Sequence, residues 1–128
     1  MSKIKVDELV EAINGELEEY VSEIKQGVSQ DLETTGKECL KKVKELSPKR
    51  TGAYRRSWAM RKITDDGDVV NVTIYNRKHY RLTSWLENGH LCRDGSRTEG
   101  KPHIRPAQEA AAAALERRIK ITVERVGQ

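Results

Sequence analysis

The chain lacks phenylalanine altogether, and aromatic residues make up only 5% of its 128 residues. Hydrophobic residues make up 36%, charged residues make up 34%, and the mean hydropathy is −0.76. A chain of this length forms one compact domain, residues 1–128, and we expect a small core of Leu, Val, Ile and Ala with Trp58 and Trp85. We also expect a domain this polar to carry a long exposed helix and to bury further apolar surface against neighbouring subunits.

Long apolar runs and clustered cysteines are absent as well. No stretch approaches the roughly 18 apolar residues of a membrane span, and the residues before Asp7 lack the apolar stretch of a signal peptide. We therefore expect a cytoplasmic protein with no membrane contact. The two cysteines, Cys39 in a helical pattern and Cys92 in a loop-like stretch, do not form the framework of a small secreted domain. We predict two free thiols.

Charge is distributed unevenly around a net value of +4. Residues 1–46 carry 7 Lys/Arg and 11 Asp/Glu, a net −4; residues 47–106 carry 13 and 6, a net +7; residues 107–128 carry 4 and 3, a net +1. This asymmetry fits two interpretations: nucleic-acid contact by the basic middle segment, or oppositely charged surfaces that meet when identical subunits form a ring. Composition alone leaves both open.

The first predicted element is a long helix over residues 7–46, because apolar positions recur there in steps of three and four. Asp7 can cap its N-terminus, and Ser47-Pro48 ends the pattern. Each of its three glycines weakens the helix by about 1 kcal/mol relative to Ala, which allows a bend or break near Gly15. We interpret the apolar face as part of the domain's own core, with a coiled-coil contact to a partner as the alternative. The face comprises Val10, Ile13, Leu17, Val21, Ile24, Val28, Leu32, Thr35, Cys39, Val43 and Leu46.

A β-hairpin is predicted next, with strands at residues 56–63 and 69–75. Asp66-Gly67 supplies the positive φ angles that a tight turn requires, and apolar and polar residues alternate along the second strand. A two-residue turn would leave Trp58 and Met60 on the face opposite to two apolar pairs. These pairs are Ile63 with Val70 and Ala59 with Ile74. A longer turn would shift the register.

The remaining elements are a short helix, a glycine-rich loop and a final helix. Residues 80–88 predict the short helix, with Leu82, Trp85 and Leu86 on one face. Gly89 to Lys101 has no apolar periodicity and predicts a mobile surface loop. Pro106 suits the first turn of a helix over residues 108–126. The predicted fold class is therefore α+β: a long N-terminal helix, a β-hairpin or small antiparallel sheet, a short helix, a loop and a C-terminal helix.

The sequence offers little support for catalysis. His90, Cys92 and His103 are the only cluster with metal-ligand chemistry, but they lack the spacing of a zinc site and are separated by an unconstrained loop. Cys92 beside His90, oriented by Glu87, would be too local for the usual nucleophile arrangement. No phosphate-binding loop, nucleophile elbow or pair of buried carboxylates is present. We expect no enzyme activity, no metal and no cofactor.

The basic segment 48–58 mixes cations with aromatic residues, as single-strand nucleic-acid surfaces do. The alternative is a solvated strand and loop whose arginines meet acidic groups of a neighbouring subunit. We keep a DNA-binding accessory protein that uses segment 49–62 as the second hypothesis, although no recognisable reader motif is present. A small metal-dependent hydrolase is the third.

Three ordered motif blocks resemble the gene-product-ten family of minor virion proteins from long-tailed bacteriophages. The blocks are Ser47-Pro48-Lys49-Arg50-Thr51-Gly52-Ala53-Tyr54-Arg55-Arg56-Ser57-Trp58, Trp85-Leu86-Glu87-Asn88-Gly89-His90, and Lys101-Pro102-His103-Ile104-Arg105-Pro106-Ala107. With the long helix before them, the resemblance spans nearly the whole chain. Arg50 departs from the family's pattern, in which an acidic or neutral residue is common. The motif residues are Ser47, Pro48, Thr51, Gly52, Ser57, Glu87, Gly89, His90, Pro102, His103, Arg105 and Pro106.

The resemblance implies a phage or prophage structural protein of the neck, where head meets tail. Such a protein assembles as a ring, contacts other head-closure or tail proteins, and is present in the virion and, during assembly, in the host cytoplasm. DNA crosses the ring without sequence recognition, so non-specific DNA contact is expected at most. The residues expected at subunit or DNA-channel contacts are Lys49, Arg50, Arg55, Arg56, Arg93, Arg97 and Lys101.

Overall fold

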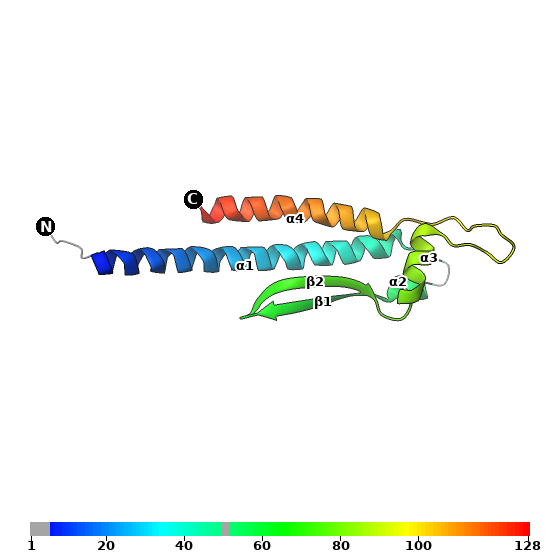
Figure 1. Cartoon of the computed structure of the whole chain (residues 1–128), viewed down its shortest axis with the longest axis horizontal. Helices are drawn as coiled ribbons and strands as arrows, with labels where there is room; N and C mark the ends of the chain where they lie inside the picture. Colours follow the sequence, from blue (N-terminus) through cyan, green and yellow to red (C-terminus); the bar gives the residue numbers. More distant parts are fainter. Residues whose placement is uncertain (1–5, 50–51) are drawn as a thin grey trace.

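The computed structural model describes residues 6–49 and 52–128, so Arg50 and Thr51 lie outside the described residues. The fold is α+β, as predicted. Its elements are α1 (Val6–Leu46), α2 (Ala53–Arg56), β1 (Trp58–Asp65), β2 (Asp68–Asn76), a 3-10 turn (Tyr80–Leu82), α3 (Thr83–Asn88) and α4 (Ile104–Val126). Figure 1 shows α1 in the middle along the length of the molecule, with α4 antiparallel on one side and the β1–β2 hairpin on the other. None of the described helices is both long enough and apolar enough to cross a membrane.

Two glycines of α1 allow its neighbours to approach closely. A Cβ atom at Gly27 would lie 2.3 Å from Thr122 Cγ2 of α4, and one at Gly36 would lie 2.6 Å from Val72 Cγ1 of the hairpin. The helix continues through Gly15 without a break. Glycines that weaken the helix in isolation are therefore the points where α4 and the hairpin contact it.

The hairpin has the predicted two-residue turn but a different register. Asp66 and Gly67 both have positive φ angles and join the pair Asp65 and Asp68. A β-bulge then shifts the pairing, so that Ile63 lies opposite Asn71 rather than Val70. The extra residue leaves Val70 exposed and turns Val69 inward.

The predicted side-chain pairs of the hairpin are wrong because of this bulge. Met60 lies opposite Ile74 and Ala59 opposite Tyr75, so Met60 shares the face of Ile74 instead of opposing it. The first strand also begins later than predicted, at Trp58, because Ala53–Arg56 forms the short helix α2.

The core is small and lies at one end of the molecule, where α2, α3 and the start of α4 meet the end of α1. It consists of the buried Val43, Tyr54, Trp58 and Ala107, with Cys39, Leu40, Ile74, Leu86 and Ile104 packed against it. Only one of the two tryptophans belongs to it. Trp58 is 6% exposed, whereas Trp85 is 55% exposed and stacks on His90, so the prediction that Trp85 lies in the core is wrong.

Farther from the core, polar contacts join α1 to α4. Thr122 Oγ1 donates to the Asp31 carboxylate at 2.6 Å, and Arg118 donates to Thr35 Oγ1 at 2.9 Å and to Glu38 at 2.5 Å. The interface therefore depends on fitted polar pairs as well as on the alanines of α4. Each pair fixes the axial position of α4 along α1.

The first part of α1 is left uncovered by the rest of the chain. Every residue from 6 to 23 is exposed, and α1 extends past both the hairpin tip and the C-terminal end of α4 (Figure 1). The interpretation of the whole apolar face as core is therefore wrong for its first four positions. These are Val10, Ile13, Leu17 and Val21.

Candidate functional site

Five residues from separate parts of the chain form a buried polar and aromatic cluster at the core end. We call Ser47, Tyr54, Trp58, Glu87 and His103 the motif cluster. Four of them are at most 7% exposed, and the Glu87 side chain is 10% exposed. The structure thus brings the three sequence blocks together in one place, which sequence spacing alone did not show.

Glu87 of α3 caps the N-terminus of α4. Its Oε1 accepts from the backbone N–H groups of His103 and Ile104, both at 2.8 Å, and its Oε2 accepts from that of Arg105 at 3.0 Å. Burial raises the pKa of Glu87, but the three N–H donors and the nearby His103 outweigh it and hold this pKa below its usual value. A carboxylate at this point satisfies the free amides of the first helical turn and interacts favourably with the helix dipole.

His103 joins the cap to Tyr54. Its Nδ1 lies 2.7 Å from the Lys101 carbonyl oxygen, which can only accept, so Nδ1 carries a proton. In the neutral ring Nε2 then accepts from the Tyr54 hydroxyl at 2.7 Å. Burial and the negative charge of Glu87 raise the pKa of Tyr54, which keeps the hydroxyl protonated and able to donate.

Trp58 and Ser47 fasten the end of α1 to the cluster. The Trp58 indole N–H donates to Ser47 Oγ at 2.9 Å, and Ser47 Oγ donates to the Val43 carbonyl at 2.5 Å. The rings of Trp58, Tyr54 and His103 meet edge to face with centroids 5.5 to 6.1 Å apart. Edge-to-face packing of this kind adds to the stability that burial provides.

The other motif residues shape the backbone around the cluster. Gly52 and Gly89 have φ angles of 77° and 78°, and a Cβ atom at Gly89 would lie 2.1 Å from the Thr98 carbonyl oxygen. Ser57 Oγ donates to the Ala53 carbonyl at 2.7 Å, and Pro106 lies in the first turn of α4 as predicted. Pro48 is half-buried, whereas Pro102 and Arg105 are exposed.

The glycine-rich segment forms a closed loop, which we call loop 89–101. Thr98 N donates to the His90 carbonyl at 2.9 Å, Cys92 N to the Ser96 carbonyl at 2.7 Å, and Lys101 N to the Leu86 carbonyl at 2.7 Å. A short bridge pairs Leu91 with Arg97. Hydrogen bonds thus close this loop at its base and near its tip.

The residues tested for metal and nucleophile chemistry do not converge. His103 is buried in the motif cluster, whereas His90 stacks on Trp85 and hydrogen-bonds to Thr98. Cys92 lies in loop 89–101, and both cysteines are free. Among the described residues, no group of three or more His, Cys, Asp or Glu side chains is placed to hold a metal ion. In the motif cluster the polar groups hydrogen-bond to one another and to the backbone of neighbouring elements, and so join these elements together.

The residues predicted as contacts lie at the core end of the molecule. Lys49, Arg56, Arg93, Arg97 and Lys101 are exposed, and Arg55 is half-buried. With Arg77, Lys78 and Arg81, which lie between the end of β2 and the start of α3, they form what we call the basic end. Two further cations of segment 49–62 lie elsewhere and are engaged: Arg61 lies over the Tyr75 ring, and Lys62 pairs with Glu33 at 2.8 Å. Segment 49–62 is thus not one continuous basic surface.

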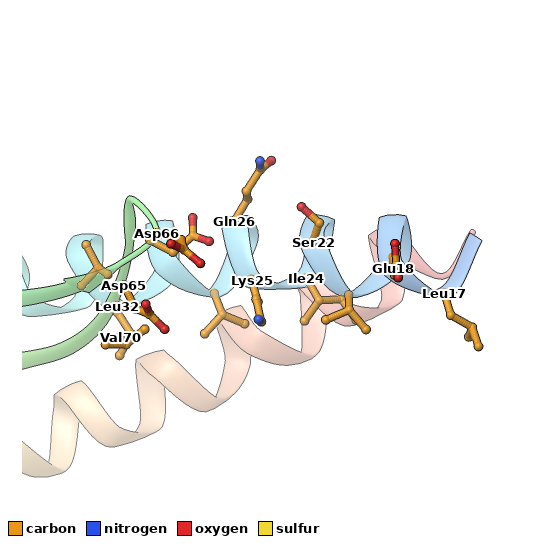
Figure 2. Close-up of a pocket in the computed structure, with 14 residues that line it drawn as sticks. Leu17, Glu18, Ser22, Ile24, Lys25, Gln26, Leu32, Asp65, Asp66 and Val70 are labelled. Atoms are coloured by element: carbon orange, nitrogen blue, oxygen red, sulfur yellow. The ribbon is translucent and has the colours of Figure 1, made fainter. Parts of the chain in front are cut away.

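The opposite end of the molecule is acidic. The sequence indicated the acidic face of the first helix as a contact surface, but not the groove that lies beside it. Residues 6–23 contain seven carboxylates and no Lys or Arg, and the hairpin tip adds Asp65, Asp66 and Asp68. Between them α1 and the hairpin tip enclose a groove of about 890 Å³ (Figure 2). The charge asymmetry of the sequence indicated the acidic character of this end. The position of the hairpin tip beside α1 could be learned only from the folded structure. Tyr54 was missed too, although it stands inside the first motif block.

Comparison with known families places this chain next to a family of phage proteins. A family model described as "Bacteriophage HK97-gp10, putative tail-component" matches residues 11–89, more than half of the chain, from α1 to the end of α3. The match includes the first motif block and the second as far as Gly89, whereas His90 and the third block, Lys101–Ala107, lie outside it. Neither the curated proteins nor the solved structures contain a match to this chain.

Proposed function

Because this chain belongs to the HK97 gp10-like family of phage tail components, we propose that it is a subunit of a ring at the head-to-tail junction of the virion. Membership gives a virion structural role and implies contact with other phage proteins. It also points to a protein that is not an enzyme. The position at the junction and the ring are the proposal.

The exposed first part of α1 carries the proposal. Its apolar residues Val6, Leu9, Val10, Ile13, Leu17 and Val21 are each about half exposed or more. Isolated helices of this length are marginal in water, and contiguous exposed apolar surface marks an interaction site. This part of α1 therefore needs a partner, and in a virion the partner is another subunit.

The motif cluster supports the same role. It fixes α1, the hairpin, α3 and α4 relative to one another through buried hydrogen bonds, so the two charged ends are held at a set distance. A ring needs such a rigid subunit because small angular errors accumulate around it. Contacts between the ends of neighbouring subunits would then define the ring.

Deletion of the gene from the phage or prophage that carries it tests the proposal. We expect separate heads and tails by negative-stain electron microscopy, loss of infectious particles, and recovery of both when the gene is supplied in trans. Mass spectrometry of purified wild-type virions should detect the protein. Normal, infectious particles from the deletion, or virions that lack the protein, would contradict a structural role at the junction.

A further inference from the structure

We infer that loop 89–101 of one copy docks in the groove between α1 and the hairpin tip of a second copy, so that identical subunits associate head to tail. The inference rests on the proposed ring and names the surfaces that would form it. It assigns a binding role to two regions that the motif cluster does not use.

The groove combines an apolar floor with an acidic rim. Leu17, Val21 and Val70 supply exposed apolar surface, and Glu18, Asp65 and Asp66 supply carboxylates. In Figure 2 the hairpin ends with Asp65 and Asp66 over α1, and α1 continues past it to Glu18 and Leu17. Lys25 is the one cation among the residues that line the groove. An occupant must therefore present apolar surface flanked by positive charge.

Loop 89–101 has these properties. Leu91 is 70% exposed, and Arg93 and Arg97 are exposed on the same short hairpin-like turn. Two carboxylates of the loop would oppose docking. That of Asp94 accepts hydrogen bonds from the backbone N–H and the hydroxyl of Ser96, and Glu99 follows Arg97 on the way back to the base of the loop. The loop thus offers an exposed apolar side chain together with two guanidinium groups, which pair well with carboxylates.

Loop 89–101 and the groove lie too far apart in one molecule to meet, so the contact must be between two copies. Loop 89–101 projects from the core end, whereas the groove lies at the other end, beside the hairpin tip (Figure 1). One molecule cannot bring the two together because the motif cluster holds the base of the loop. Two different surfaces meet in such a contact, which makes it heterologous. Repeated contacts of this kind form a closed ring when the rotation from one subunit to the next adds up to a full turn.

Charge argues against the simplest alternative, in which two copies pair through the same face of α1. Residues 6–23 carry seven carboxylates and no cation, so such a pair would place like charges side by side. Pairing residues 6–23 with the basic end of another copy avoids this repulsion, whereas pairing them with a second acidic end does not. The partner of the acidic groove is therefore the basic end of another copy.

Two single substitutions test the contact because each removes one half of it. Leu91→Asp places a carboxylate on the loop, and Leu17→Asp places one on the groove floor; both positions are more than half exposed, so both variants should fold. By sedimentation velocity at low salt we expect wild type to self-associate and each variant to show a dissociation constant raised by about tenfold or more. Added salt should weaken wild-type association.

Mixing the two variants distinguishes a heterologous contact from a symmetric one. The Leu17→Asp variant keeps an intact loop, and the Leu91→Asp variant keeps an intact groove. Their mixture should form a 1:1 heterodimer that grows no further, whereas a symmetric interface would give no such rescue. Ile121→Asp is the matched control, since Ile121 is equally exposed on α4 and lies outside the groove. It should associate like wild type.

Several results would overturn the inference. These are a wild-type protein that stays monomeric at the highest soluble concentration, variants that associate like wild type, and a mixture that does not pair. Salt-sensitive binding of duplex DNA that is lost in an Arg93→Glu, Arg97→Glu variant with unchanged self-association would assign the basic end to DNA instead. Each of these results leaves the role in the virion standing, because that role is tested separately by particle assembly.

Discussion

The two halves of α1 carry the same spacing of apolar residues but have different surroundings. From Ile24 to Leu46 the helix is covered by α4 on one side and by the hairpin on the other, and Thr35, Gly36 and Val43 are buried. From Val6 to Glu23 every residue is exposed. The periodicity therefore identifies the apolar face of the helix. Which part of that face is buried within one chain depends on how far α4 and the hairpin extend along it.

This difference separates two roles along one helix. The covered half, with the motif cluster at its end, provides the stability of the folded chain. The free half contributes little to that stability because it buries no side chain. Substitutions in the two halves should therefore have unequal effects on the free energy of unfolding.

The largest effect is expected at Trp58. Trp58→Ala should lower the free energy of unfolding by about 3–5 kcal/mol, because it empties a buried site and removes the bond to Ser47. Trp85→Ala is the matched control, since Trp85 is mostly exposed. Urea unfolding followed by circular dichroism measures both. Equal losses for the two tryptophans would contradict the placement of the core.

Glu87→Gln should cost about 1–3 kcal/mol at neutral pH, because one amide oxygen replaces a carboxylate that accepts three N–H bonds. The loss should depend on pH. The pKa of Glu87 is lower in the folded chain than its ordinary 4.5, so its contribution is complete above that value and is lost as the pH falls below it.

Urea unfolding of wild type and Glu87→Gln between neutral pH and pH 3 measures this dependence. The two unfolding free energies should converge as the solution becomes more acidic. Glu99→Gln, an exposed change in loop 89–101, is the control and should leave both stability and its pH dependence unchanged. A constant difference between wild type and Glu87→Gln at all pH values would show that the charge of the cap does not matter.

Gly36→Ala tests the packing of the hairpin against the covered half of α1. The new methyl group would lie 2.6 Å from Val72 Cγ1 and 2.8 Å from Met60 Sδ, so the hairpin must shift. This cost exceeds the gain in helix propensity, and we expect a net loss of about 1–2 kcal/mol in thermal or urea unfolding. Unchanged or increased stability would show that the hairpin adapts freely.

Gly15→Ala is the counterpart in the free half and should have the smallest effect on unfolding. Nothing lies within 4 Å of a Cβ atom at Gly15, so only the propensity gain of about 1 kcal/mol remains. Because residues 6–23 do not pack in one chain, this gain should increase helix content at 222 nm and slow amide exchange there. The urea midpoint should hardly move. A large rise in that midpoint would place the free half within the cooperative unit.

Much of the fold could be predicted from local patterns. The step of three and four residues located α1 to within one residue of its start, and Asp66-Gly67 located the turn. The bulge could not be predicted from local pattern. It accompanies the packing of Val69 toward α1, which is a tertiary contact, and it leaves the two-residue turn at Asp66-Gly67 unchanged. The two tryptophans also differ in a way that local sequence does not show, because only the fold brings Ser47, Tyr54 and His103 around Trp58.

Less of the candidate site could be predicted. The motif blocks were recognised as a resemblance, but the reason for them is tertiary. Glu87 caps a helix that begins 17 residues later, and Tyr54 reaches His103 across 49 residues. No local spacing encodes such contacts. The acidic groove also depends on two segments that meet only in the folded chain, although the charge asymmetry that marks it was visible.

The base of loop 89–101 is held in place by backbone contacts, so the sequence of the loop itself can vary without affecting the rest of the fold. The backbone passes close to itself at the base, between Gly89 and Gly100, where a Cβ atom at Gly100 would lie 2.5 Å from the Glu87 carbonyl oxygen. The Glu87 side chain fixes the start of α4 independently of the loop's tip. Residues between these anchors can therefore change in sequence or number without moving α4. A protein built in this way can acquire a new partner by rewriting about ten residues while its frame stays the same.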